Sequence, residues 1–201
     1  MAATKAEFWF DPVCPWAWMT SRWILEVEKV RDIEVQWNLF SLAHLNRDKE
    51  LSDEYKKGLI RSWQCTRVIA AAQKVKGVSI TLPLYTAISS RIHLQKMTVG
   101  EELFSQALSE VGLDPSLSTA MKDESYNAAI IESHERGINL VGNDVGTPII
   151  SVAGAAFFGP VISPAPKGEE AGKLWDGVVG VASYPGFFEI KRSRTVGPIF
   201  D

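Results

Sequence analysis

The chain opens with the pattern of a strand, a helix and a second strand. Residues 6–11 have the pattern of a short buried strand, because three consecutive aromatic residues precede an Asp-Pro breaker. Apolar residues then recur at steps of three and four over residues 15–31, which predicts an amphipathic helix. Residues 33–42 alternate apolar and polar side chains and predict a second strand. This order implies a parallel pair of strands joined by a right-handed crossover.

The middle of the chain has a helical pattern. Ser52-Asp53-Glu54 is typical of a helix start, and Gly77 ends the stripe of apolar residues that follows it. Glycine and proline residues separate four further segments that we predict to be helical, 84–94, 101–111, 115–122 and 125–137.

The last third of the chain returns to strands. Residues 148–152 and 155–158 are short apolar runs around an Ala-Gly turn, which predicts a hairpin. Residues 169–182 predict a final helix. Its three glycines, Gly172, Gly177 and Gly180, predict close packing on a sheet.

Together these elements predict an α/β protein with a four-stranded mixed sheet. The helical segments then form a large all-helical insertion that packs on one end of the sheet. We place the insertion at residues 47–145 and the sheet domain at residues 1–46 and 146–201.

Composition and charge exclude several classes of protein. The 201 residues are 46% hydrophobic and 22% charged, which is typical of a globular chain with a buried core. The net charge of −3 excludes a nucleic-acid binder that depends on net positive charge. No apolar run approaches the roughly 18 residues of a membrane span. The polar first residues lack the apolar core of a signal peptide, so we expect a cytoplasmic protein. We interpret the basic run 191–194 as a solvated end.

The few cysteines and the spacing of the histidines argue against a disulfide-rich scaffold and against a metal site. Two cysteines exclude a disulfide-rich scaffold. The three histidines, His44, His93 and His134, lack the spacing of metal ligands, so we predict no metal site and interpret His44 and His134 as structural.

Cys14 lies where the first predicted strand gives way to the first helix. Pro15 suits the first helical position, so Cys14 is expected at or next to the N-cap. Free backbone N–H groups and the helix dipole stabilise a thiolate there and lower the thiol pKa below about 8.5. We therefore predict a reactive cysteine; the alternative is a buried structural one.

The second sulfur of a dithiol site is absent. It would stand three residues on, where this chain has Ala17. Cys65 lies within a predicted helix and is interpreted as a small half-buried apolar residue.

Other candidate residues are individually unremarkable. On cis frequency alone, Pro148 after Thr147 is an ordinary proline at a strand start. Trp16 lies on the first helical turn, where it would form the wall of a substrate pocket. Asn46 and Tyr55 flank a charged loop and have the pattern of routine cap or loop residues.

The chain nevertheless resembles a known family. Cys14-Pro15-Trp16 after a first strand, the helical insertion, and Thr147-Pro148 before a hairpin resemble the DsbA-like branch of the thioredoxin superfamily. More closely, the sequence is similar to the actinobacterial mycothiol-dependent nitroreductases and reductases of that branch. The matching stretches span nearly the whole chain: FWFDPVCPWAW, SRWILEVEKVRDIEV, LYTAISSRIH, VGNDVGTPII, AFFGPV and EEAGKLWD.

The resemblance implies a thioredoxin fold in which Cys14 is the nucleophile and Pro148 is a cis-proline beside it, which reverses the interpretation above. It implies mycothiol as cosubstrate, with no metal and no flavin, and a cytoplasmic location. The implied partners are a low-molecular-weight thiol and a small-molecule or protein disulfide or electrophile, with no nucleic acid and no membrane; a homodimer is compatible with it. The residues that it places in the substrate site are Pro15, Trp16, Asn46, Tyr55, Thr147 and Pro148.

Ala17 departs from the family pattern, which is Cys-Pro-Trp-Cys with the second cysteine as the resolving one. Either the chain carries a Cys-to-Ala change of the kind that traps a mixed disulfide, or the natural protein works with one thiol. The intact motif around position 17 favours the first explanation.

Three classes of function compete at this point. The leading one is a thiol-dependent oxidoreductase that uses mycothiol and reduces disulfides or nitro-type electrophiles. The alternative is an enzyme like 2-hydroxychromene-2-carboxylate isomerase or a kappa-class transferase, for which Ala17 is no obstacle. A non-catalytic binding module is the third, and the intact Cys14-Pro15 argues against it.

Overall fold

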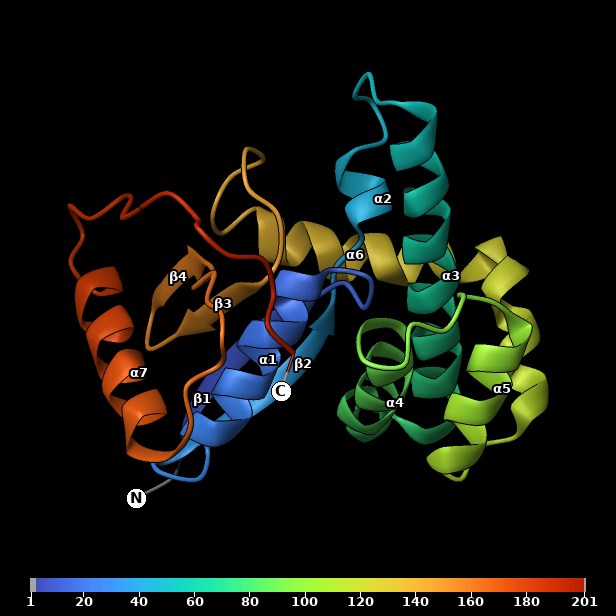
Figure 1. Ribbon diagram of the computed structural model, residues 1–201, viewed down its shortest axis with the longest axis horizontal. Coiled ribbons are helices and arrows are strands. Elements are labelled where there is room, and N and C mark those ends of the chain that lie inside the picture. The colour runs from blue at the N-terminus through green and yellow to red at the C-terminus, as the bar shows by residue number, and fades with distance from the viewer. Residues whose placement is uncertain (1–2, 201) are drawn as a thin grey trace.

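The computed structural model describes residues 3–200, apart from the side chain of residue 54, and is built around one sheet (Figure 1). The sheet has four strands in the order β2-β1-β3-β4. β1 and β2 run parallel, whereas β3 is antiparallel to both β1 and β4. The mixed four-stranded sheet is therefore confirmed. The strand bounds are β1 Thr4–Phe10, β2 Ile33–Leu39, β3 Ile149–Val152 and β4 Ala155–Phe158.

Helices cover both faces of this sheet (Figure 1). Phe8 and Phe10 of β1 point to the face covered by α1 (Pro15–Val27), where Phe10 stacks on Tyr85 with ring centroids 3.8 Å apart. Trp9 points to the opposite face, because successive strand residues alternate. There its indole Nε1 donates to the Ser133 carbonyl, 2.9 Å away.

Two predicted elements end earlier than the sequence pattern suggested. α1 ends at Val27 rather than near residue 31, because Val30 and Arg31 turn back and donate to the Val27 carbonyl. β2 ends at Leu39, since Ser41 caps a short helix, α2 (Leu42–Leu45), that the pattern did not predict.

The segment between β2 and β3 is largely helical, and its described residues contain no strand. α3 (Asp53–Lys76) starts after the Ser52 cap and ends at Gly77, whose φ of 78° favours glycine. Residues 115–122 form a helix, as predicted, and it is of the 3₁₀ type. The division into a sheet domain (1–46 and 146–201) and an insertion (47–145) stays a prediction. The remaining bounds are η1 Val78–Ile80, α4 Thr81–His93, α5 Glu101–Glu110, η2 Pro115–Lys122, η3 Glu124–Tyr126 and α6 Asn127–Ile138.

The last helix, α7 (Gly168–Ala182), packs against α1 through the pair Trp23 and Trp175. Of the three glycines predicted to pack closely, only Gly172 makes a close approach. A Cβ at Gly172 would lie 2.6 Å from the Arg31 guanidinium, whereas Cβ atoms at Gly177 and Gly180 would meet no described atom within 4 Å. The prediction that all three glycines serve close packing is therefore wrong for the last two. No helix in the described part of the chain is both long and apolar enough to cross a membrane.

Candidate functional site

Cys14 lies at the N-cap of α1, as its sequence context predicted. Its Sγ accepts a hydrogen bond from the Ala17 N–H at 3.4 Å. The same thiol donates to the Thr147 carbonyl at 3.4 Å, across 133 residues of sequence. The sulfur is therefore held between the first turn of α1 and the segment that leads into β3.

The expectation of a lowered thiol pKa is wrong for this conformation. Burial raises the pKa of Cys14 to about 12, and the charge of Asp11 raises it further. The N–H groups of Ala17 and Trp16 act in the opposite direction, but they do not offset the loss of solvation. Only 7% of Cys14 is exposed, so the thiol as seen here is neutral and covered.

Asp11 is a site residue that sequence reasoning missed. It is fully buried, and burial raises the pKa of its carboxyl to about 6. Its carboxylate accepts from the Val13 N–H at 3.0 Å and from the Leu42 N–H at 2.7 Å. It also accepts from the Ser62 hydroxyl of α3. Asp11 thus joins the loop that carries Cys14 to α2 and α3. An acidic residue at the end of a predicted buried strand, three residues before a candidate nucleophile, was the available signal.

The Thr147–Pro148 segment faces the thiol. The peptide bond between the two residues is cis. The Thr147 side chain is oriented by its own hydrogen bond to the Trp9 carbonyl, 2.8 Å away, so the segment is tied to β1. Pro15 occupies the first turn of α1, and Trp16 beside it is half-buried.

Asn46 and Tyr55 are less closely connected to the thiol. Asn46 is 8% exposed, and its amide Nδ2 donates to the Leu42 carbonyl at 2.8 Å, so it closes the end of α2. Tyr55 is 47% exposed on α3. Within residues 3–200 no contact joins either side chain to Cys14 or Trp16. The structure therefore brings Cys14, position 17 and Thr147 together, but not the whole predicted pocket.

The two cysteines form no disulfide. Cys65 is fully buried in α3, and burial raises the pKa of its thiol well above the ordinary value. Both cysteines are free. Ala17 is fully buried beside Cys14, where the backbone of the first helical turn presents position 17 to the sulfur.

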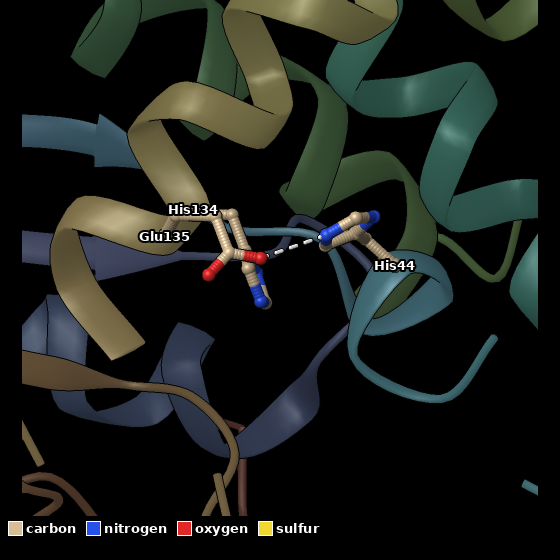
Figure 2. Close-up of side chains that lie close together, drawn as sticks. All are labelled: His44, His134 and Glu135. Atoms are coloured by element: carbon tan, nitrogen blue, oxygen red, sulfur yellow. Dashed lines mark hydrogen bonds and ion pairs between the residues drawn. The ribbon is translucent and has the colours of Figure 1, made fainter. Parts of the chain in front are cut away.

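Three side chains near α2 have the donor types of a metal site (Figure 2). His44 of α2 approaches Glu135 of α6, with Nε2 and Oε1 3.0 Å apart, and His134 lies beside them. However, His134 Nδ1 accepts from the Ser41 N–H at 3.3 Å, which leaves the proton on Nε2. Histidines that bind metals usually donate from their second nitrogen rather than accept. The arrangement therefore fits a structural link between α2 and α6 better than a metal centre.

Comparison with known proteins gives a consistent result. The family model for the Rv2466c-like mycothiol-dependent nitroreductases matches residues 13–192. An uncharacterized protein of Mycobacterium tuberculosis, Rv2286c, is 29% identical over 198 residues, which cover 96% of this chain and 83% of the relative.

Solved structures show the same fold at low sequence identity. A probable DsbA oxidoreductase from Streptomyces coelicolor superimposes with a TM-score of 0.59 at 15% identity, covering 96% of this chain and 94% of that structure. The cytosolic disulfide reductase DsbM from Pseudomonas aeruginosa, solved with GSH, has a TM-score of 0.57 at 16% identity, with 88% and 99% covered. The fold is therefore DsbA-like, as predicted.

Proposed function

This chain belongs to the mycothiol-dependent nitroreductase family, and from that premise we propose that it is a thiol-dependent oxidoreductase in which Cys14 is the nucleophile. Mycothiol is the proposed cosubstrate, and the proposed substrates are disulfides or nitro-type electrophiles. We place the reaction in the cytoplasm, where related mycothiol reductases work.

One observation carries the proposal. The Cys14 sulfur lies between the Ala17 N–H and the Thr147 carbonyl, at the edge of the sheet where α1 begins. A disulfide that approaches this edge meets the sulfur along the Thr147–Pro148 segment, and Pro15 and Trp16 flank it. Asn46 and Tyr55 complete the proposed pocket from α2 and α3. In support, the Leu42 N–H of α2 and the Val13 N–H of the loop that carries Cys14 both donate to the Asp11 carboxylate.

The proposed step is thiol–disulfide exchange. Cys14 loses its proton and attacks one sulfur of an oxidised thiol, whose S–S bond breaks. A mixed disulfide forms at Cys14, and the other half leaves as a thiolate that takes up a proton. The raised pKa of Cys14 means that the covered site must open, or the substrate must replace the lost solvation, before the thiolate forms.

Incubation with oxidised mycothiol, followed by mass spectrometry of the intact protein, tests this proposal. We expect one mycothiol adduct per chain, which persists because position 17 carries no sulfur. Cys14→Ser removes the adduct, whereas the matched control Cys65→Ser keeps it. An adduct that survives Cys14→Ser would contradict the assignment of the nucleophile.

Ala17→Cys tests the resolving position. The introduced sulfur attacks the mixed disulfide, mycothiol leaves as a thiol, and a disulfide forms between position 17 and Cys14. We expect the adduct to disappear within minutes in this variant. An adduct of equal lifetime in both proteins would show that position 17 is not the resolving site.

Ala17 also favours a second candidate, an isomerase or transferase in which one thiol-stabilising site suffices. Such an enzyme activates a bound thiol without forming a disulfide at Cys14. Failure to form any adduct, together with turnover that survives Cys14→Ser, would favour this candidate over the first.

A further inference from the structure

The C-terminal segment is mostly exposed, but it folds back to contact Trp16 of α1 and His93 of α4. After α7 the chain runs back across the molecule and ends beside α1 and α4 (Figure 1). The Ser163 hydroxyl donates to the Gly197 carbonyl at 3.0 Å and accepts from the Ile199 N–H at 2.8 Å. The Phe200 ring stacks on His93 of α4, with centroids 5.6 Å apart. The segment is thus anchored at Ser163 and at His93 of α4.

Between these elements the segment carries a cation to the first turn of α1. The Arg194 guanidinium carbon lies 5.1 Å from the centre of the Trp16 ring, and Trp16 is two residues from Cys14. Residues 191–194 are all exposed, as the interpretation of a solvated end predicted, but Arg194 also contacts the Trp16 ring. Neighbouring Arg192 makes no interaction with any described residue and is exposed.

The donors of Arg194 are uncommitted. Within residues 3–200 its guanidinium forms no hydrogen bond and no ion pair, and its contact is with an aromatic ring. A guanidinium that lies over a ring leaves its N–H groups at the edges, where they can bind a carboxylate through two parallel hydrogen bonds. The N–H donors of the Arg194 guanidinium therefore lie beside the first turn of α1, which holds the Cys14 thiol.

We propose that Arg194 is a specificity-determining residue, and that it selects electrophiles that carry an anionic oxygen group beside the atom that Cys14 attacks. The proposal rests on the proposed function, because it needs Cys14 as the nucleophile. It goes beyond the family resemblance, since the family match ends at residue 192.

The charge near the thiol explains why an anionic substrate would need Arg194. The buried Asp11 disfavours negative charge near Cys14, so an anionic substrate needs a compensating cation at the entrance. Arg194 supplies one on the exposed side, where a carboxylate keeps part of its hydration. Added salt screens such an exposed pair, so the preference should weaken as ionic strength rises.

Two aromatic disulfides provide the test, dianionic dithiobis-nitrobenzoate and neutral dithiodipyridine. Each reacts in one turnover without mycothiol: Cys14 loses its proton to solvent and attacks a sulfur, the reagent's S–S bond breaks, and a mixed disulfide forms. The nitrobenzoate half leaves as a coloured thiolate, whereas the pyridine half takes up a proton and leaves as a thiopyridone that absorbs in the near ultraviolet. All proteins carry Cys65→Ser, so Cys14 is the only thiol present.

The readout is the ratio of the two rate constants, anionic over neutral. We expect Arg194→Gln to lower this ratio about threefold to tenfold, the range for loss of charge-assisted hydrogen bonds at an exposed site. Arg192→Gln, the matched control, should leave the ratio within twofold. Arg194→Lys should restore part of it, because a lysine keeps the charge but loses the fork.

The outcomes separate the two proposals. If Cys14 reacts with both reagents and Arg194→Gln changes both rates by one factor, the tail controls access only, and the specificity proposal is overturned while the proposed function stands. An equal fall in the ratio for Arg192→Gln would also overturn it, since net charge would then suffice. If native Cys14 reacts with neither reagent, the nucleophile assignment fails and the specificity proposal fails with it.

Discussion

His134 should make the stability of this protein fall on mild acidification. The side chain is 1% exposed, packs on Phe40 with ring centroids 4.1 Å apart, and accepts the Ser41 N–H through Nδ1. Burial lowers the pKa of His134 from 6.5 to about 4; the charge of Glu135 opposes this shift and that of Arg47 adds to it. Protonation would remove the acceptor and place a charge where Ser41 caps α2.

The sign and size follow from proton linkage. Between about pH 7 and pH 5 the unfolded chain takes up nearly one proton on this histidine, whereas the folded chain takes up about a tenth of one. The free energy of unfolding therefore falls by about 2 kcal/mol. His93, 5% exposed, has a pKa lowered by burial to about 4 and adds a similar loss. Asp11 acts oppositely: its raised pKa of about 6 restores about 1 kcal/mol. The net expected loss is about 2–3 kcal/mol.

Urea unfolding followed by tryptophan fluorescence at the two pH values measures this loss. His134→Asn keeps an acceptor for the Ser41 N–H but has no proton to gain, so its loss should be smaller by about 2 kcal/mol. Phe40→Leu is the control, because it weakens packing against the same ring without changing a titratable group. Equal losses in the wild-type protein and His134→Asn would refute the reasoning.

Three further predictions rest on separate features. Alkylation of the native protein, followed by peptide mapping, should label Cys14 before Cys65. The rate of Cys14 labelling should rise about tenfold per pH unit between about pH 7 and pH 9; a plateau of this rate near neutrality would contradict the raised pKa. Gly137→Ala should destabilise by about 1–3 kcal/mol, because its Cβ would lie 2.8 Å from Trp9, whereas Gly177→Ala should stabilise by about 0.5–1 kcal/mol; equal effects in thermal unfolding would contradict this. Ser62→Ala should cost about 1–3 kcal/mol in urea unfolding, because it removes a donor from the buried Asp11 carboxylate; an unchanged free energy of unfolding would contradict this.

Local patterns predicted the sheet and most helices, because their signals are short-range. The Ser52 cap and Gly77 bounded α3 correctly, since each acts on its own helix end. α2 escaped prediction because its four residues are too few to show a period. The early end of α1 and the open surroundings of Gly177 depend on which neighbours pack there, and a helical period carries no information about that.

The site was predictable in part. The position of Cys14 at a helix start follows from Pro15 and the preceding strand, so the sequence located it. The raised thiol pKa did not follow, because burial is a property of the packed molecule. Arg194 against Trp16 joins residues at opposite ends of the chain, and no local pattern reports such a contact.

The carboxylate of Asp11 limits how this scaffold can be recombined. It draws donors from the Cys14 loop, from α2 and from α3, so its environment spans the proposed border between sheet and insertion. A helical block transplanted from a relative without a hydroxyl at position 62 would leave a buried acceptor short of a donor, at a cost of about 1–3 kcal/mol. The loop that carries the nucleophile would be destabilised by this amount, because Asp11 belongs to it. A chimaera that exchanges the helical block to change substrate range must therefore keep the pair Asp11 and Ser62 together.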